Sequence, residues 1–205
     1  MTREARREAI LEVAREVFSE EGYAAASMSD IASRLGGSKG TLYNYFSSKE
    51  ALFAAHVQNQ CQCKVATAFE QPLEGEDPVA VLADLGERLI AALSSDESTG
   101  FYSLIVSESQ RTPTVGQTFY ESGPKTGIAR VAAFLEHART EGHIGTDDCT
   151  QAAADFISLI YGGLPWRRLL NVLPQPSPAE IRTEAVRVAQ LFMRAYGPRD
   201  RSKPD

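Results

Sequence analysis

The segment of residues 27–53, SMSDIASRLGGSKGTLYNYFSSKEALF, places three polar helix starts in one short stretch. The starts are Ser27, Ser38 and Ser47, and the first and third have an acidic residue three positions later, as in a capping box. Two glycines, Gly36 and Gly37, lie where the first short helix must end and the chain must turn. Two short helices joined by a tight glycine-containing turn form the helix-turn-helix arrangement that DNA-reading proteins use.

The middle helix of this segment, predicted over residues 39–46, has one apolar and one polar side. Leu42 and Phe46, four residues apart, share the side expected to face a core. The opposite side is small and polar and suits base edges in a major groove, while the flanking tyrosines can donate to phosphates. The candidate DNA-contacting residues are Ser27, Ser38, Lys39, Gly40, Thr41, Tyr43, Asn44, Tyr45 and Lys49.

These candidates have different expected roles. Thr41 and Asn44 are the candidates for reading bases, and Gly40 permits close approach, although glycine inside a helix costs about 1 kcal/mol relative to alanine. The tyrosines, Lys49 and the two serines are candidate phosphate contacts. Arg3, Arg6 and Arg7 open the first helix, either as a solvated helix end or as an arm that touches phosphate. A tyrosine-rich surface helix of an ordinary bundle is the alternative, but the three starts, the glycine turn and the polar strip together favour DNA reading.

The same segment resembles the DNA-binding domain of the tetracycline-repressor (TetR) family of transcriptional regulators. The matching positions are Ile31-Ala32, Gly36, Ser38, Gly40-Thr41-Leu42-Tyr43, Tyr45-Phe46, Ser48-Lys49-Glu50 and Ala51-Leu52-Phe53. Gly37 and Leu35 depart from it, because the family usually has a small apolar residue and an alanine there. Residues 101–124 also resemble the C-terminal domain of AefR-like members. The resemblance implies a double-stranded DNA operator, a small-molecule effector and a homodimer as partners, and repression as the usual activity.

The composition favours an all-α chain that binds DNA through local contacts. The 205 residues suit one large or two modest domains, alternating strand-like runs are absent, and helix-forming residues are abundant. The net charge is −6, but residues 1–50 carry seven basic and eight acidic side chains, so most of the acidic excess lies in residues 51–205. Binding to DNA should therefore depend on local contacts and on salt concentration.

Helical periodicity and helix-breaking residues predict two domains. Besides the short helices, helices are predicted over residues 3–21, 48–70, 78–95, 99–111, 114–141, 147–173 and 178–196, with Gly22 ending the first. Gly123-Pro124 and Pro165 should split the segments that contain them. The predicted organisation is a three-helix DNA-binding domain at 1–50, a connecting helix at 48–70, a C-terminal ligand-binding and dimerisation domain at 51–197 and a flexible tail at 198–205.

The last two long helices are apolar on more than one side. Such a helix needs two partners, which are its own domain and, in a two-fold dimer, a second copy of the chain. Burial inside its own domain alone is the alternative. The candidate dimer-interface residues are Phe156, Ile160, Leu164, Ile181, Val188 and Phe192. The family resemblance also implies dimerisation through the two C-terminal helices, which would place two recognition helices about 34–36 Å apart.

Several aromatic residues and one carboxylate of the C-terminal half are candidates for a pocket that takes a small, partly apolar molecule. They are Tyr102, Ile105, Glu108, Phe119, Tyr161 and Trp166. For each residue alone, core packing is the simpler interpretation, and only the group favours a pocket.

The sequence contains no pattern for catalysis, a cofactor or a metal. Cys61 and Cys63 lie near His56, but residues two apart on a helix point about 200° from one another and cannot grip one ion without unwinding. HExxH and glycine-rich phosphate loops are absent. The odd number of cysteines, the charged N-terminus and the lack of an apolar run of about 20 residues favour a cytoplasmic protein without a membrane partner.

These patterns predict a DNA-binding transcriptional regulator, most simply a ligand-responsive repressor that binds a palindromic operator as a dimer. The alternative is a ligand-free helical interaction protein that uses the helix-turn-helix as a docking surface. An enzyme is not expected.

Overall fold

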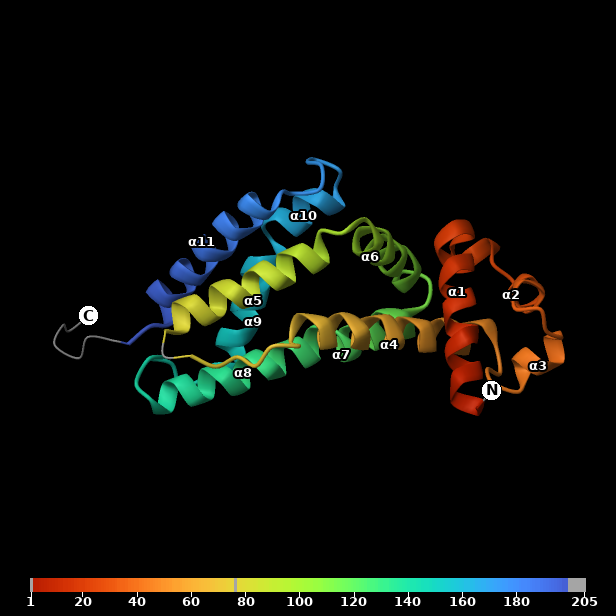
Figure 1. Cartoon of the computed structure of the whole chain (residues 1–205), viewed down its shortest axis with the longest axis horizontal. Coiled ribbons are helices and arrows are strands. Elements are labelled where there is room, and N and C mark those ends of the chain that lie inside the picture. The colour runs from red at the N-terminus through yellow and green to blue at the C-terminus, as the bar shows by residue number, and fades with distance from the viewer. Residues whose placement is uncertain (1, 76, 199–205) are drawn as a thin grey trace. The chain divides into compact units, whose positions relative to one another are not determined.

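The computed structural model describes residues 2–75 and 77–198, and within them the chain is helical and contains no strand (Figure 1). The helices are α1 Arg3–Ala25, α2 Met28–Arg34, α3 Lys39–Tyr43, α4 Lys49–Ala68, α5 Pro78–Leu93, α6 Asp96–Ser109, α7 Pro113–Ser122, α8 Pro124–Thr140, α9 Cys149–Tyr161, α10 Leu164–Leu169 and α11 Pro178–Tyr196. The predicted all-α class is confirmed. In the described part of the chain, no helix is long and apolar enough to cross a membrane. The tail predicted at 198–205 lies, apart from Pro198, outside the described residues.

Glycine and proline divide the helices where the sequence predicts it. The segment 114–141 is split into α7 and α8 at Gly123, and Pro124 occupies the first turn of α8, where its missing N–H has no helical partner to lose. The segment 147–173 is likewise split into α9 and α10, with Pro165 in the first turn of α10. Gly22 has a φ of 74° and interrupts α1, after which one further turn follows.

The chain forms two compact units. Unit 1 comprises the residues up to Cys63 together with Gly100–Ser122, and unit 2 comprises Lys64–Thr99 and the chain from Gly123 onward. This division differs from the predicted ranges 1–50 and 51–197, because most of α6 and all of α7 belong to unit 1, where they contact α4.

Unit 1 has a core of aliphatic and aromatic side chains from α1, α2, α3, α4, α6 and α7. Its largest fully buried side chains are Ile10, Phe18, Ile31, Leu42, Leu52 and Phe53. His56 lies among them with 3 % of its surface exposed. Its ring centroid is 5.8 Å from that of Phe18 and 5.9 Å from that of Phe101. Burial, with a smaller contribution from the charge of Arg15, lowers the pKa of His56 to about 4, so this imidazole is neutral at pH 7.

Unit 2 is built around the contact between α5 and α11, the most extensive helix pairing in the described chain. A Cβ placed on Gly86 of α5 would lie 3.2 Å from Cβ of Ala185 on α11 and 3.3 Å from Cδ1 of Ile160 on α9. The absence of a side chain at Gly86 therefore permits the close approach of these helices. Phe156 and Phe192 meet edge to face at 5.5 Å in the same core.

Polar caps fix the starts of α5, α9 and α11 in unit 2. Asp77 and Asp148 cap α5 and α9 through their side-chain oxygens. At the start of α11, Ser177 Oγ accepts from the Glu180 N–H at 3.3 Å, and Glu180 Oε2 accepts from the Ser177 N–H at 2.8 Å. The capping-box pattern at residues 177–180 is thus formed, and it satisfies backbone donors that a helix start otherwise leaves unpaired.

Substituting Gly86 by valine should destabilise unit 2. The added methyl groups would overlap Ala185 and Ile160, and overpacking of this kind costs about 1–3 kcal/mol. Gly100→Val is the matched control, because a Cβ on Gly100 meets no atom within 4 Å. Thermal unfolding followed by circular dichroism would measure the difference. Equal melting temperatures for the two variants would show that the α5–α11 packing does not require glycine.

His56 should make the stability of unit 1 depend on pH. Its native pKa of about 4 lies below its ordinary value of 6.5, so the unfolded state takes up the proton first. Stability is therefore full above about pH 6.5 and decreases as the pH falls toward 4, by on the order of 3 kcal/mol in total. Urea unfolding of the wild type and His56→Phe at pH 7.5 and 5 would measure this contribution.

The exposed His137 supplies the control for that experiment. Its side chain is 73 % exposed, so His137→Phe should keep the pH dependence of the wild type, whereas His56→Phe should weaken it. An unchanged pH dependence in His56→Phe would contradict the assignment.

Candidate nucleic-acid interface

Serine caps and a glycine turn form the helix-turn-helix of unit 1. Ser27 Oγ accepts from the Asp30 N–H at 3.2 Å, and Ser38 Oγ accepts from the Thr41 N–H at 3.1 Å. Between the two helices, Gly36 adopts a φ of 67°, a left-handed conformation that favours glycine. The first two predicted starts and the turn are therefore present.

The third predicted start is displaced by one residue. Ser48 Oγ, not Ser47, accepts from the Ala51 N–H at 3.1 Å, and α4 begins at Lys49. A backbone hydrogen bond and the Ser48 hydroxyl hold the pKa of the Glu50 carboxyl below its usual range. Glu50 therefore stabilises the start of α4 as predicted, but its capping partner is Ser48 and not Ser47.

Helix α3 is shorter than the predicted 39–46. It ends at Tyr43, and the next residues form a tight turn in which the Asn44 N–H is shared by two carbonyls and the Tyr45 N–H bonds Leu42 O at 3.0 Å. The predicted facing is nevertheless observed, because Leu42 and Phe46 are both buried in the core of unit 1.

The outward side of α3 carries exposed groups that contribute little to packing or hydrogen bonding within the described residues. Tyr43 is 45 % exposed, and the side-chain amide of Asn44 makes no hydrogen bond within the described residues. A Cβ on Gly40 would meet only Ser38 Oγ at 3.7 Å, an ordinary contact, so folding does not require glycine there. The Thr41 hydroxyl lies 2.9 Å from Ser38 Oγ, which leaves its methyl group as the apolar contact surface. Lys39 is exposed, and Tyr45 is half-buried.

Two arginines of α1, for which the sequence allows either a solvated helix end or a phosphate contact, lie near this surface. The Arg7 guanidinium lies 5.5 Å from the centre of the Phe46 ring. A Cβ on Gly37 would lie 3.1 Å from Arg6 Nη2, so Arg6 rests against the turn between α2 and α3. Arg6 forms no ion pair within the described part of the chain. Their positive charge was visible in the sequence, but this placement depends on how α1 packs.

Lys49, a predicted phosphate contact, instead binds backbone carbonyl groups of its own chain. Its Nζ donates to the carbonyl oxygens of Tyr23 at 2.8 Å and Ala26 at 3.0 Å, and lies 3.4 Å from that of Ala24. The ammonium is also 4.5 Å from the centre of the Tyr23 ring. Lys49 is thus bound to the end of α1.

The predicted pocket residues are divided between the two units. In unit 1, Ile105 and Glu108 are buried, and Tyr102 meets Phe119 edge to face at 5.6 Å. In unit 2, Tyr161 is half-buried and Trp166 is 51 % exposed. The residues of each set pack within their own unit or lie on its surface. A ligand site formed by all six residues stays a prediction.

The residues predicted for a dimer interface are mostly used inside unit 2. Phe156, Ile160, Leu164, Val188 and Phe192 are buried in its core, and Ile181 packs partly buried against it. They leave little surface for a second subunit, and a dimer interface formed by these six residues stays a prediction. Apolar side chains that do face outward are Trp166, Leu170, Val172 and Leu191.

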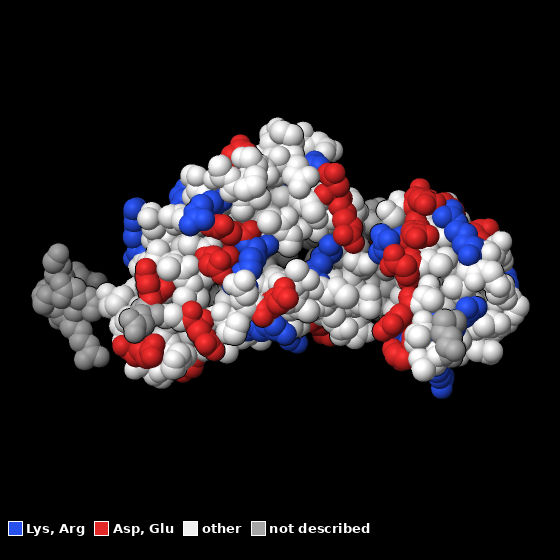
Figure 2. Space-filling model, viewed as in Figure 1, with Lys and Arg blue, Asp and Glu red and all other residues white. Residues whose placement is uncertain are grey.

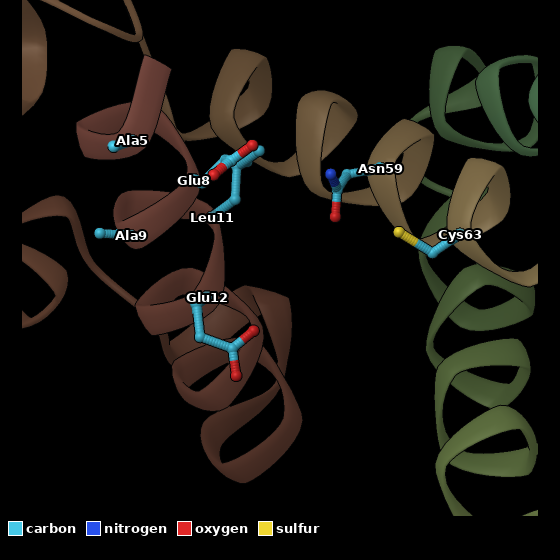
Figure 3. Close-up of a pocket in the computed structure, with 7 residues that line it drawn as sticks. All are labelled: Ala5, Glu8, Ala9, Leu11, Glu12, Asn59 and Cys63. Carbon is cyan, nitrogen blue, oxygen red and sulfur yellow. The ribbon is translucent and has the colours of Figure 1, made fainter. Parts of the chain in front are cut away.

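An open groove of about 500 Å³ lies between α1 and α4 in unit 1 (Figure 3). It is lined by Ala5, Glu8, Ala9, Leu11, Glu12, Asn59 and Cys63. The Glu12 carboxylate accepts a hydrogen bond from the Arg15 guanidinium, and this bond lowers the pKa of Glu12. With two carboxylates and no aromatic side chain, the groove does not suit a partly apolar ligand, and it contains none of the predicted pocket residues.

Neither the surface charge nor the cysteines indicate a further binding site. On the face shown in Figure 2, acidic and basic side chains are interspersed and no large region carries one sign. Cys61 is buried and Cys63 exposed, so the two thiols lie on different sides of α4. Among the described residues, no group of three possible metal ligands comes together.

Comparison with known proteins identifies both halves of the chain. Residues 10–56 match a family model described as bacterial regulatory proteins of the tetR family. Residues 80–198 match a model described as the C-terminal domain of AefR-like transcriptional repressors.

Proteins that match most of the chain are transcriptional regulators. The regulator UidR of Escherichia coli K12 is 34 % identical over 159 residues, which cover 76 % of this chain and 78 % of UidR. A solved TetR-family regulator from Mesorhizobium loti matches with a TM-score of 0.85 and 28 % identity over 96 % of this chain and 100 % of its own. The structure of the flavonoid-responsive regulator FrrA matches with a TM-score of 0.83 and 33 % identity over 96 % of this chain and 99 % of FrrA.

Proposed function

Because the chain belongs to the TetR family of bacterial transcriptional regulators, we propose that it is a repressor that binds a palindromic operator as a homodimer and releases it when a small molecule binds. The observation that carries the proposal is the outward strip of α3, where Gly40, Tyr43 and Asn44 are exposed and unused by the fold. We expect the protein to act in the cytoplasm, where operator DNA lies.

The side chains of α3 suit the major groove. An asparagine amide can donate to and accept from one adenine, which suits the unpaired Asn44, and the methyl group of Thr41 suits a thymine methyl. Gly40 lets the helix backbone approach the base edges. We propose phosphate contacts for Tyr43, Tyr45, Lys39 and the capping serines Ser27 and Ser38. Such contacts fix the register of a protein on DNA without reading its sequence.

Arg6 joins the proposed phosphate contacts. Its guanidinium has no acidic partner among the described residues, and it rests against the turn that precedes α3. An unpaired guanidinium beside the recognition helix suits a phosphate oxygen, to which arginine binds in a two-pronged geometry.

We propose that the dimer contact uses the outward apolar side chains of unit 2. Leu170 is 54 % and Val172 68 % exposed, and they follow Trp166 closely in sequence. Exposed apolar side chains that cluster on a surface mark interaction sites. The proposed dimer region therefore remains the two segments 147–173 and 178–196, which contain α9, α10 and α11. The buried side chains named above support this region from within unit 2.

Repression and its relief are proposed from the relatives. The C-terminal family model is named for repressors, and FrrA is named as flavonoid-responsive. Flavonoids are therefore the first probes to test as effectors. Release of DNA requires that the effector bind the DNA-free conformation more tightly than the DNA-bound one.

A salt titration separates the regulator from a ligand-free interaction protein. A regulator should bind a duplex from beside its own gene far more tightly than random DNA, by about 10³-fold or more. Affinity that is equally weak for both duplexes would favour the interaction protein.

Substituting Gly40 by alanine should weaken operator binding without weakening the fold. Alanine is the better helix former by up to about 1 kcal/mol, so the melting temperature should stay the same or rise. Its methyl group would meet the DNA, and we expect an operator affinity about tenfold lower in fluorescence anisotropy. Gly100→Ala, a solvent-exposed helical glycine with free space around it, is the control and should leave affinity unchanged. A Gly40→Ala protein with wild-type affinity would remove α3 from the proposed groove contact.

Charged substitutions on the outward apolar surface of unit 2 should produce monomers. Leu170→Glu with Val172→Glu would place carboxylates in the proposed contact, and light scattering should report half the mass of the wild type. Val106→Glu is the matched control, because Val106 is an exposed valine of α6 with a similar exposed fraction of 48 %. If the double variant stays dimeric, or if the wild type is itself a monomer, the proposed contact fails.

A further inference from the structure

The end of α1 leaves carbonyl groups that need donors. After the interruption at Gly22, residues 23–25 form one more turn, and the carbonyls at the end of a helix have no partner within it. The Lys49 ammonium has three N–H groups, and three carbonyl oxygens of residues 23–26 lie 2.8, 3.0 and 3.4 Å from it. The donors of Lys49 are therefore matched in number by acceptors from α1.

Tyr23 is held from two sides by consecutive residues of α4. The Lys49 ammonium lies 4.5 Å from the centre of its ring, and its hydroxyl donates to Glu50 Oε1 at 3.2 Å. The ring also packs on Phe53, one turn further along α4, at 4.6 Å. Burial and the neighbouring Glu50 carboxylate raise the pKa of Tyr23 to about 12, so its hydroxyl remains a donor at neutral pH.

A second cation binds the same end of α1 from α2. Arg34 donates to Glu20 Oε2 at 2.5 Å and to Glu21 Oε1 at 2.8 Å. The last turns of α1 are thus joined to α2 by Arg34 and to α4 by Lys49. Since α3 lies between α2 and α4 in the chain, these two cations fix both sides of the helix-turn-helix.

We propose that Lys49 is a positioning residue for operator binding, which holds the first residue of α4 against the end of α1 and thereby sets the orientation of α3, rather than a phosphate contact. The proposal rests on the operator binding proposed above. A phosphate contact would require the ammonium to give up these carbonyl oxygens, which accept from no other donor among the residues that the structure describes. Because α4 continues from unit 1 into unit 2, a displacement of α4 on effector binding would act directly on the Lys49 contacts.

The two roles differ in their dependence on salt. Each lost phosphate contact reduces the slope of log K against log salt concentration by about 0.9. Loss of a positioning contact lowers affinity at every salt concentration and leaves that slope unchanged. They also differ in their tolerance of arginine, because a planar guanidinium suits a phosphate but not three carbonyls converging on one ammonium.

The experiment compares Lys49→Met and Lys49→Arg with the wild type over a range of salt concentrations. We expect both variants to bind operator about tenfold or more weakly with the slope of the wild type, and Lys49→Met to have a lower melting temperature. Lys125→Met, which removes an exposed lysine of unit 2, controls for the change in net charge and should match the wild type. A slope reduced by about 0.9 per contact, or near-normal binding by Lys49→Arg, would overturn the proposal.

A measurement on the wild type covers the case in which Lys49→Met does not fold. In the operator complex, NMR can detect scalar coupling between a lysine ammonium nitrogen and the phosphorus of a bound phosphate. We expect none for Lys49, and its detection would overturn the proposal. If the wild type shows no preference for operator, the proposed function fails separately, and the positioning role is then read from the melting temperatures of Lys49→Met and Lys125→Met, whose equality would overturn it.

Discussion

Burial of Leu42 and Phe46 is the constraint on which the proposed DNA surface depends. A helix as short as α3 has no stability of its own, because nucleating a helix costs more than one turn of hydrogen bonds returns. It persists because two apolar side chains anchor it in the core of unit 1 and Ser38 caps its start. Fixing Leu42 inward also determines which residues face outward, so the strip at Gly40 and Asn44 follows from the core.

The same logic applies to the long charged side chains around α1. Arg34 and Lys49 both bind its last turns, where carboxylates and unpaired carbonyls collect negative potential. A cation at the C-terminal end of a helix is stabilising wherever it comes from in the sequence. These polar contacts add to the apolar packing of Met28, Ile31 and Ala32 in the core of unit 1.

Local signals made most of the fold predictable from sequence, and long-range contacts set the limit. Glycine and proline breaks, and caps such as Ser177, act within a few residues, so boundaries such as those at Gly123, Pro165 and Ser177 could be predicted from sequence. Ser47 and Ser48 are chemically equivalent neighbours, and only the packing of α4 decides between them. An apolar residue such as Val188 looks the same whether its partner is its own core or a second subunit, and the partners of Lys49 lie 23 to 26 residues away. Sequence periodicity contains neither kind of information.

Gly37 shows how a departure from a family pattern can be explained by such a contact. The family usually has a small apolar side chain at this turn, and a Cβ here would lie 3.1 Å from Arg6 Nη2. Gly37 therefore leaves room for the Arg6 guanidinium, which would have to move by a few tenths of an ångström if a side chain were present. The turn residue and the placement of Arg6 are thus related through this one contact.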